Sequence, residues 1–126
     1  MCPALLSALQ QTRKLYLTTY SRTGKSGTVP VWFFLHEKAL YFCTLRHSLK
    51  VRRIQQTGKV TIHIGRRHGV RVDCTASVLA DDPALQSVLL QTYRRRYPIV
   101  WLWIGRRLRK AFAQGREVIV QLTPLP

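Results

Sequence analysis

The stretch TLRHSLKVRR, Thr44 to Arg53, joins the end of a predicted strand to the start of a predicted helix. Ser48 is a favourable N-cap residue, so the helix should begin immediately after it. A capping box would place Glu or Gln three residues after the cap, but Val51 stands there. The first turn carries Lys50 and Arg53 instead, at the end of the helix dipole where cations are least favourable.

Two explanations fit this placement of charge. A phosphate at the helix N-terminus would accept hydrogen bonds from free backbone N–H groups, from the hydroxyls of Thr44 and Ser48, and from the side chains of Lys50 and Arg53. The alternative is a solvated basic face on a basic protein. Charge placement alone leaves both explanations open.

The sequence on either side of this segment predicts six strands. They are expected at residues 14–20, 28–36, 39–45, 59–65, 70–80 and 116–124. The second, TVPVWFFLH, is apolar on both faces and is therefore predicted to be central. Helices are expected at residues 3–13, at 48–56, from 83 to the break before Pro98, and from about 99 to 112, with Asp82 as an N-cap. Short connections favour an antiparallel, mainly β (α+β) fold, a six-stranded β-barrel with flanking helices, in a single domain of residues 1–126.

The charge balance limits the partners of the chain. Twenty-one Lys and Arg face five Asp and Glu, which gives a net charge of +16. This excess attracts anions, so the candidate partners are nucleic acid, an anionic membrane and a small polyanion. Three cysteines without a C-x-x-C pair favour a reducing compartment, and no secretory signal is visible, so a cytoplasmic protein is expected.

Several familiar sites are excluded by spacing. The GKS at 24–26 lacks the Gly five residues earlier and the following helix that a P-loop needs. The four histidines show no metal spacing, so no metal site is expected. Cys43 and Cys74 fall at strand positions, where a thiol is usually a packing group rather than a nucleophile.

The pattern strand, T-x-x-x-S-x-K-x-x-R, helix, strand resembles the phosphate-binding segment of the pyridoxamine 5'-phosphate oxidase-like split-barrel flavoproteins. Upstream, YLTTYSRTGKSGTVPVWFF (residues 16–34) is similar to the first hairpin of the subgroup that depends on coenzyme F420. Downstream, GKVTIHIG, ASVLADDP, TYRRRYP and VIVQLTP follow in the family order, so the resemblance covers nearly the whole chain.

The resemblance implies an FMN-binding-type split barrel that works as a homodimer with two cofactor sites at the interface. Cofactor phosphate would be held by Thr44, Ser48, Lys50 and Arg53, and the backbone of Pro30, Val31 and Trp32 would run along the cofactor ring. Pro30 within a strand also indicates an edge or a bulge. A possible cofactor-tail or substrate pocket would draw on Lys25, Arg94, Arg95, Arg96, Tyr97 and Trp101, with Trp103 beside them.

One departure from the family bears on the reaction. True pyridoxamine phosphate oxidases end in R-L-x-P, whereas this chain has Gln121-Leu122-Thr123-Pro124, and Gln cannot supply the charge of that Arg. The resemblance therefore implies hydride transfer between reduced coenzyme F420 and a small organic acceptor. FMN is the alternative cofactor, and the larger polyanion F420 suits the net charge of +16 better. The sequence identifies no proton donor.

Two binding functions remain as alternatives. A nucleic-acid binder would also be basic, but no helix-turn-helix, zinc finger or RNP-like segment is present, so nucleic acid is not the expected partner. A membrane-surface role rests on RRRYPIVWLWIGRRLRK, residues 94–110, in which apolar residues recur at helical spacing among seven cations. The same pattern is typical of a helix that caps a barrel, and that interpretation is favoured.

Overall fold

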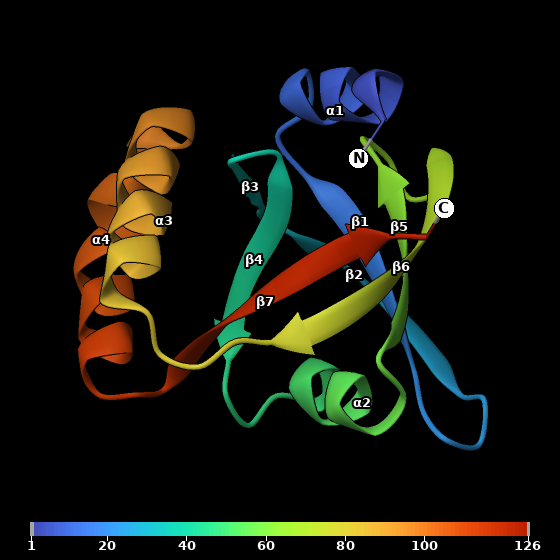
Figure 1. Cartoon of the computed structure of the whole chain (residues 1–126). Coiled ribbons are helices and arrows are strands. Elements are labelled where there is room, and N and C mark those ends of the chain that lie inside the picture. The colour runs from blue at the N-terminus through green and yellow to red at the C-terminus, as the bar shows by residue number, and fades with distance from the viewer. Residues whose placement is uncertain (1, 126) are drawn as a thin grey trace.

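A computed structural model describes residues 2–125. Within this range four helices surround one antiparallel sheet of seven strands (Figure 1). The helices are α1 (Pro3–Gln10), α2 (Leu49–Thr57), α3 (Pro83–Arg96) and α4 (Pro98–Ala113). The strands are β1 (Leu15–Tyr20), β2 (Ser26–Val31), β3 (Phe34–His36), β4 (Ala39–Leu45), β5 (Lys59–Ile64), β6 (Val70–Val78) and β7 (Glu117–Pro124).

The sheet curls into a half-barrel because its two edges are neighbours in the sequence. The strand order is β2-β1-β5-β6-β7-β4-β3, so β2 and β3 are the two edges, and only Trp32 and Phe33 separate them along the chain. Three peptide units reach about 11 Å at most. A flat sheet of seven strands would hold its edges about 29 Å apart, at about 4.8 Å between neighbouring strands. The short Trp32-Phe33 corner therefore requires curvature.

This corner corrects the predicted second strand. Residues 28–36 were expected to form one central strand, and the structure divides them into β2 and β3 at opposite edges of the sheet. The sheet consequently has seven strands rather than six. Pro30 lies in edge strand β2, as expected, where its missing N–H costs no ladder hydrogen bond on the open side.

The predicted starts of α2 and α3 are confirmed by their caps, whereas the first helix, expected over residues 3–13, ends at Gln10. Ser48 Oγ accepts a hydrogen bond from the Val51 N–H at 3.3 Å, and α2 ends at Gly58, whose φ is 65°. Asp82 Oδ1 accepts from the Leu85 N–H at 3.1 Å and begins α3. Pro98 separates α3 from α4, as predicted.

Two groups of buried side chains hold the elements together. The first fills the barrel and is closed at its ends by Leu9 of α1 and Ile54 of α2. The second lies between the outer side of the sheet and the α3–α4 pair, and includes Phe34, Tyr93 and Trp101. Within residues 2–125, no helix has the length and apolar character needed to cross a membrane.

Candidate functional site

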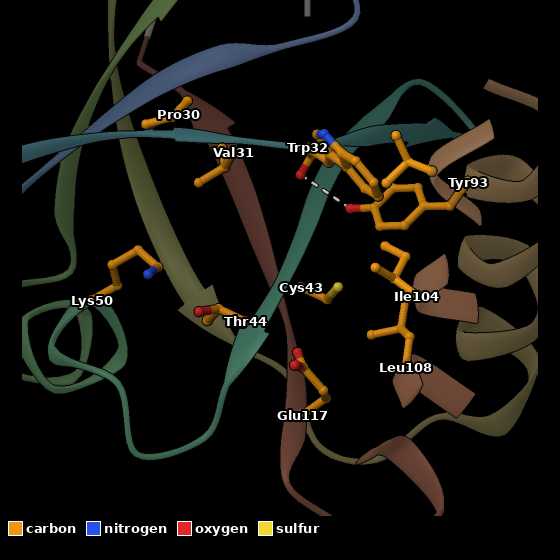
Figure 2. Close-up of a pocket in the computed structure, with 11 residues that line it drawn as sticks. Pro30, Val31, Trp32, Cys43, Thr44, Lys50, Tyr93, Ile104, Leu108 and Glu117 are labelled. Atoms are coloured by element: carbon orange, nitrogen blue, oxygen red, sulfur yellow. Dashed lines mark hydrogen bonds between the residues drawn. The ribbon is translucent and has the colours of Figure 1, made fainter. Parts of the chain in front are cut away.

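A cavity of about 460 Å³ opens between the end of the barrel and α4. It is lined by Pro30, Val31, Trp32, Cys43, Thr44, Lys50, Tyr93, Val100, Ile104, Leu108 and Glu117. Figure 2 shows these side chains around one space, with Lys50 and Thr44 on one side and Ile104 and Leu108 on the other. Its size falls in the usual range of small-molecule sites, about 300–1,000 Å³.

One end of the cavity is lined by hydroxyl and cationic side chains. β4 ends beside it and places Thr44, of which 8% is exposed, with its Oγ1 3.4 Å from Ser48 Oγ. Ser48 caps α2, and the N–H groups of Leu49 and Lys50 at the start of the helix have no intrahelical acceptor. Lys50 supplies the cation, and no acidic residue occupies the first turn of α2. Hydroxyls, backbone N–H groups and an ammonium form a donor set that suits phosphate.

Arg53 lies one helical turn beyond Lys50 and does not line the cavity. Its Nε is buried and has no hydrogen-bond partner among the described residues. A Cβ built on Gly27 of β2 would lie 3.1 Å from Arg53 Nη1, so the guanidinium rests against that strand. An unsatisfied buried donor of this kind is rare and is consistent with a missing anionic partner.

The other end of the cavity is apolar and aromatic. The ring of Trp32 stacks on that of Tyr97, with centroids 4.1 Å apart and planes 8° from parallel. Tyr93 is buried and its hydroxyl donates to the backbone oxygen of Trp32 at 3.0 Å, which fixes the corner between β2 and β3. Val100, Ile104 and Leu108 of α4 complete the wall. A flat ring system fits such a lining.

Two titratable groups, Cys43 and Glu117, lie between these ends on adjacent strands. Burial is the main cause that raises the pKa of the Glu117 carboxyl, and the positive charges of Lys50 and Arg116 partly oppose it. Burial, followed by the nearby charge of Glu117, raises the pKa of the Cys43 thiol far above its usual range. Cys43 is therefore a neutral thiol at physiological pH and not an activated nucleophile.

The predicted cofactor residues fall close together. Five of them, Pro30, Val31, Trp32, Thr44 and Lys50, line the cavity, while Ser48 adjoins Thr44 and Arg53 rests against Gly27 of β2. The tail and substrate candidates do not line it, although Tyr97 stacks on the cavity residue Trp32.

Lys25 is exposed in the β1–β2 turn, and Arg94 and Arg95 are exposed on α3. Arg96 donates to the carbonyls of Phe33 and Thr12, and Trp101 is buried beneath Arg109.

Sequence reasoning missed three polar groups of the cavity, namely Cys43, Tyr93 and Glu117. The signal for Glu117 was available, because it is one of only five acidic residues and begins a strand paired with the strand of Thr44. Tyr93 and the α4 residues carried no local signal, since only the packing of α3 and α4 brings them to the site. Within residues 2–125, no three His, Cys, Asp or Glu side chains group as a metal site would require.

The chain was compared with known proteins at the level of family, sequence and structure. The family model described as pyridoxamine 5'-phosphate oxidase matches residues 1–124. No curated protein sequence matches the chain significantly.

Among solved structures, the heme storage protein HutZ from Vibrio cholerae is 14% identical with a TM-score of 0.72, over 98% of this chain and 89% of that one. A protein named F420 reductase is 16% identical with a TM-score of 0.62, over 95% and 92% of the two chains. A pyridoxamine 5'-phosphate oxidase-related, FMN-binding protein from Nostoc punctiforme is 21% identical with a TM-score of 0.64, over 98% and 81%. At these identities the likeness shows the shared split-barrel fold.

Proposed function

The chain belongs to the pyridoxamine 5'-phosphate oxidase family of split-barrel proteins, and we propose that its cavity binds a phosphate-bearing cofactor of the flavin type. The observation that carries the proposal is the polarity of the cavity. Thr44, Ser48 and Lys50 gather at one end, and Trp32 with the α4 residues lines the other. This arrangement suits a ligand with a flat ring at one end and a phosphate at the other.

We further propose that the cofactor is the deazaflavin coenzyme F420, with FMN as the alternative. F420 carries a phosphodiester and a polyglutamate tail, so it has more negative charge than FMN. A chain with 21 cationic and five acidic side chains attracts the more anionic ligand more strongly. The fold is also that of a protein named F420 reductase, although FMN-binding relatives share it.

The bound cofactor would supply hydride chemistry, and the chain would supply binding, orientation and a proton. Lys50 and the first turn of α2 would hold the phosphate, while Trp32 and the backbone of Pro30 and Val31 would orient the ring. Glu117, whose carboxyl pKa burial raises, would hold a proton beside the cavity near neutral pH more often than an exposed Glu. Gln121 lacks the charge of the family's substrate Arg, so oxidation of pyridoxamine phosphate is not proposed.

The functional unit is proposed to be a homodimer. The resemblance to the family implies cofactor sites at a dimer interface, so a second chain would close the cavity. Light scattering at micromolar protein should give the mass of two chains. A monomer that still binds cofactor tightly would contradict this part of the proposal.

A single-turnover assay tests the proposed activity. Protein loaded with reduced F420 should transfer hydride to a small acceptor such as a nitroaromatic compound or a quinone, and should regain the absorption of the oxidised cofactor. Glu117→Gln should slow this step at neutral pH without weakening cofactor binding. Stable binding without turnover on any acceptor would indicate a cofactor carrier, and turnover with FMN alone would favour the alternative cofactor.

A further inference from the structure

Helix α4 uses only part of its apolar surface for packing. Trp101 and Phe112 are 9% and 8% exposed and face the sheet, and Val100, Ile104 and Leu108 line the cavity. Three further large apolar side chains remain in solvent: Ile99, Leu102 and Trp103 are 75%, 83% and 81% exposed. These three residues are called the α4 patch. Barrel capping explains the inward residues of α4 and leaves the patch without a role.

The patch is a continuous surface. Residues at i, i+3 and i+4 lie on one side of a helix, so Ile99, Leu102 and Trp103 are neighbours. They occupy the first two turns of α4, on the side of the helix away from Ile104 and Leu108. An exposed cluster of Trp, Leu and Ile on a monomer usually marks an interaction surface.

Cations flank the patch along the chain and along the helix. Arg106, Arg107 and Lys110 are exposed in the next turns of α4, on the side that carries the patch. Arg94 and Arg95 are exposed at the end of α3, immediately before α4 begins. No carboxylate lies between Pro83 and Arg116, so these charges have no acidic neighbour in their own helices.

We propose that the α4 patch and its flanking cations dock the protein on an anionic lipid membrane. Trp103, Leu102 and Ile99 would enter the interface between headgroups and acyl chains, and Arg106, Arg107 and Lys110 would contact the anionic headgroups. The association is peripheral and does not depend on the cofactor. It leaves the cavity accessible, because Ile104 and Leu108, which line the cavity, lie on the side of α4 away from the patch.

The charges around the α4 patch favour a membrane over a second copy of the chain or a nucleic acid as its partner. In a symmetric dimer through this face, each cation would approach its own copy, and a chain with five acidic residues offers little to neutralise them. A nucleic acid would use the cations but would leave Ile99 and Leu102 in solvent. An anionic bilayer is the partner that satisfies both the apolar and the cationic part of the surface.

Vesicle flotation of the whole chain tests the proposal. The wild type should float with vesicles of phosphatidylcholine and phosphatidylglycerol, and at least ten-fold less with phosphatidylcholine alone. Leu102→Ser/Trp103→Ser should lose most of the binding, whereas the control Val70→Ser/Leu125→Ser removes exposed apolar residues elsewhere and should retain it. Arg106→Gln/Arg107→Gln should weaken binding about thirty-fold, at about 1 kcal/mol for each cation near the surface. Arg66→Gln/Arg67→Gln, which removes the same charge from the distant β5–β6 turn, should weaken it far less (Figure 1).

The insertion depth of Trp103 in the bilayer and the folding of each variant are measured on the same proteins. Brominated acyl chains should quench the wild-type fluorescence more than that of Trp103→Phe, because Trp103 is the exposed tryptophan of α4. All substitutions are at exposed positions, and each variant should melt like the wild type and bind cofactor equally well. Equal flotation of wild type and Leu102→Ser/Trp103→Ser would overturn the proposal. The proposal would also be overturned if the wild type did not float and the patch variants instead lost their dimer mass or their binding to DNA.

Discussion

Replacement of Lys50 by Ala separates ligand binding from folding at the candidate site. Lys50 lines the cavity beside Thr44, at the start of α2. A charge-assisted hydrogen bond from its ammonium to a phosphate is worth roughly 1.5–3 kcal/mol. Its removal should therefore weaken cofactor binding about ten- to a hundred-fold.

The free protein should respond differently, because two effects oppose each other. Loss of a cation at the helix N-terminus relieves an unfavourable interaction with the helix dipole. Loss of the attraction between Lys50 and Glu117 acts in the other direction. The free energy of unfolding should change by less than about 1 kcal/mol.

Fluorescence titration with F420 and FMN, and thermal melts without either, measure the two quantities. Lys59→Ala is the matched control: it removes the same charge from an exposed residue that does not line this cavity. A Lys50→Ala protein that binds both cofactors as tightly as the wild type would refute the phosphate site. The basic first turn of α2 would then be a solvated face.

Three further predictions concern the surroundings of the site. Ser48→Ala removes the N-cap of α2, so the free protein should lose about 1 kcal/mol of stability in urea denaturation. The variant should also bind cofactor more weakly. Unchanged stability would contradict the capping role of Ser48. Because burial raises the pKa of Glu117, the folded state holds the proton of this carboxyl more tightly than the unfolded state does. The contribution of Glu117 to stability should therefore fall as pH rises through its folded-state pKa. Glu117→Gln should lose this part of the pH dependence of stability, and a variant with the same pH profile as the wild type would contradict the prediction. Neutralisation of the exposed Arg94 and Arg95 should weaken binding of polyglutamyl F420 more than that of FMN in parallel titrations, and equal weakening would mean that the two residues contribute only to the general field.

The helix caps and the phosphate segment could be predicted because their signals are local. Ser48 and Asp82 cap α2 and α3 as expected, since a capping residue acts on N–H groups within three positions of it. The grouping of Thr44, Ser48 and Lys50 follows from the same short strand-to-helix turn.

The barrel fold was predicted correctly, but the corner at which the chain passes from β2 to β3 was not. The run TVPVWFFLH looks like one buried strand, because periodicity does not report where a strand leaves one edge of a sheet and joins the other. The contribution of Tyr93 and Ile104 to the cavity depends on how α3 and α4 pack against β3 and β7. The exposure of Trp103 beside the buried Trp101 likewise required the three-dimensional structure.

Native mass spectrometry of the protein offered equimolar F420 and FMN tests the central claim most directly. The mass of the adduct identifies the ligand without assuming a reaction, and its abundance reports the preference between the two. The proposed function predicts one cofactor for each chain, predominantly F420, and loss of most of the adduct in Lys50→Ala. A folded wild-type protein that retains neither cofactor would contradict the proposal.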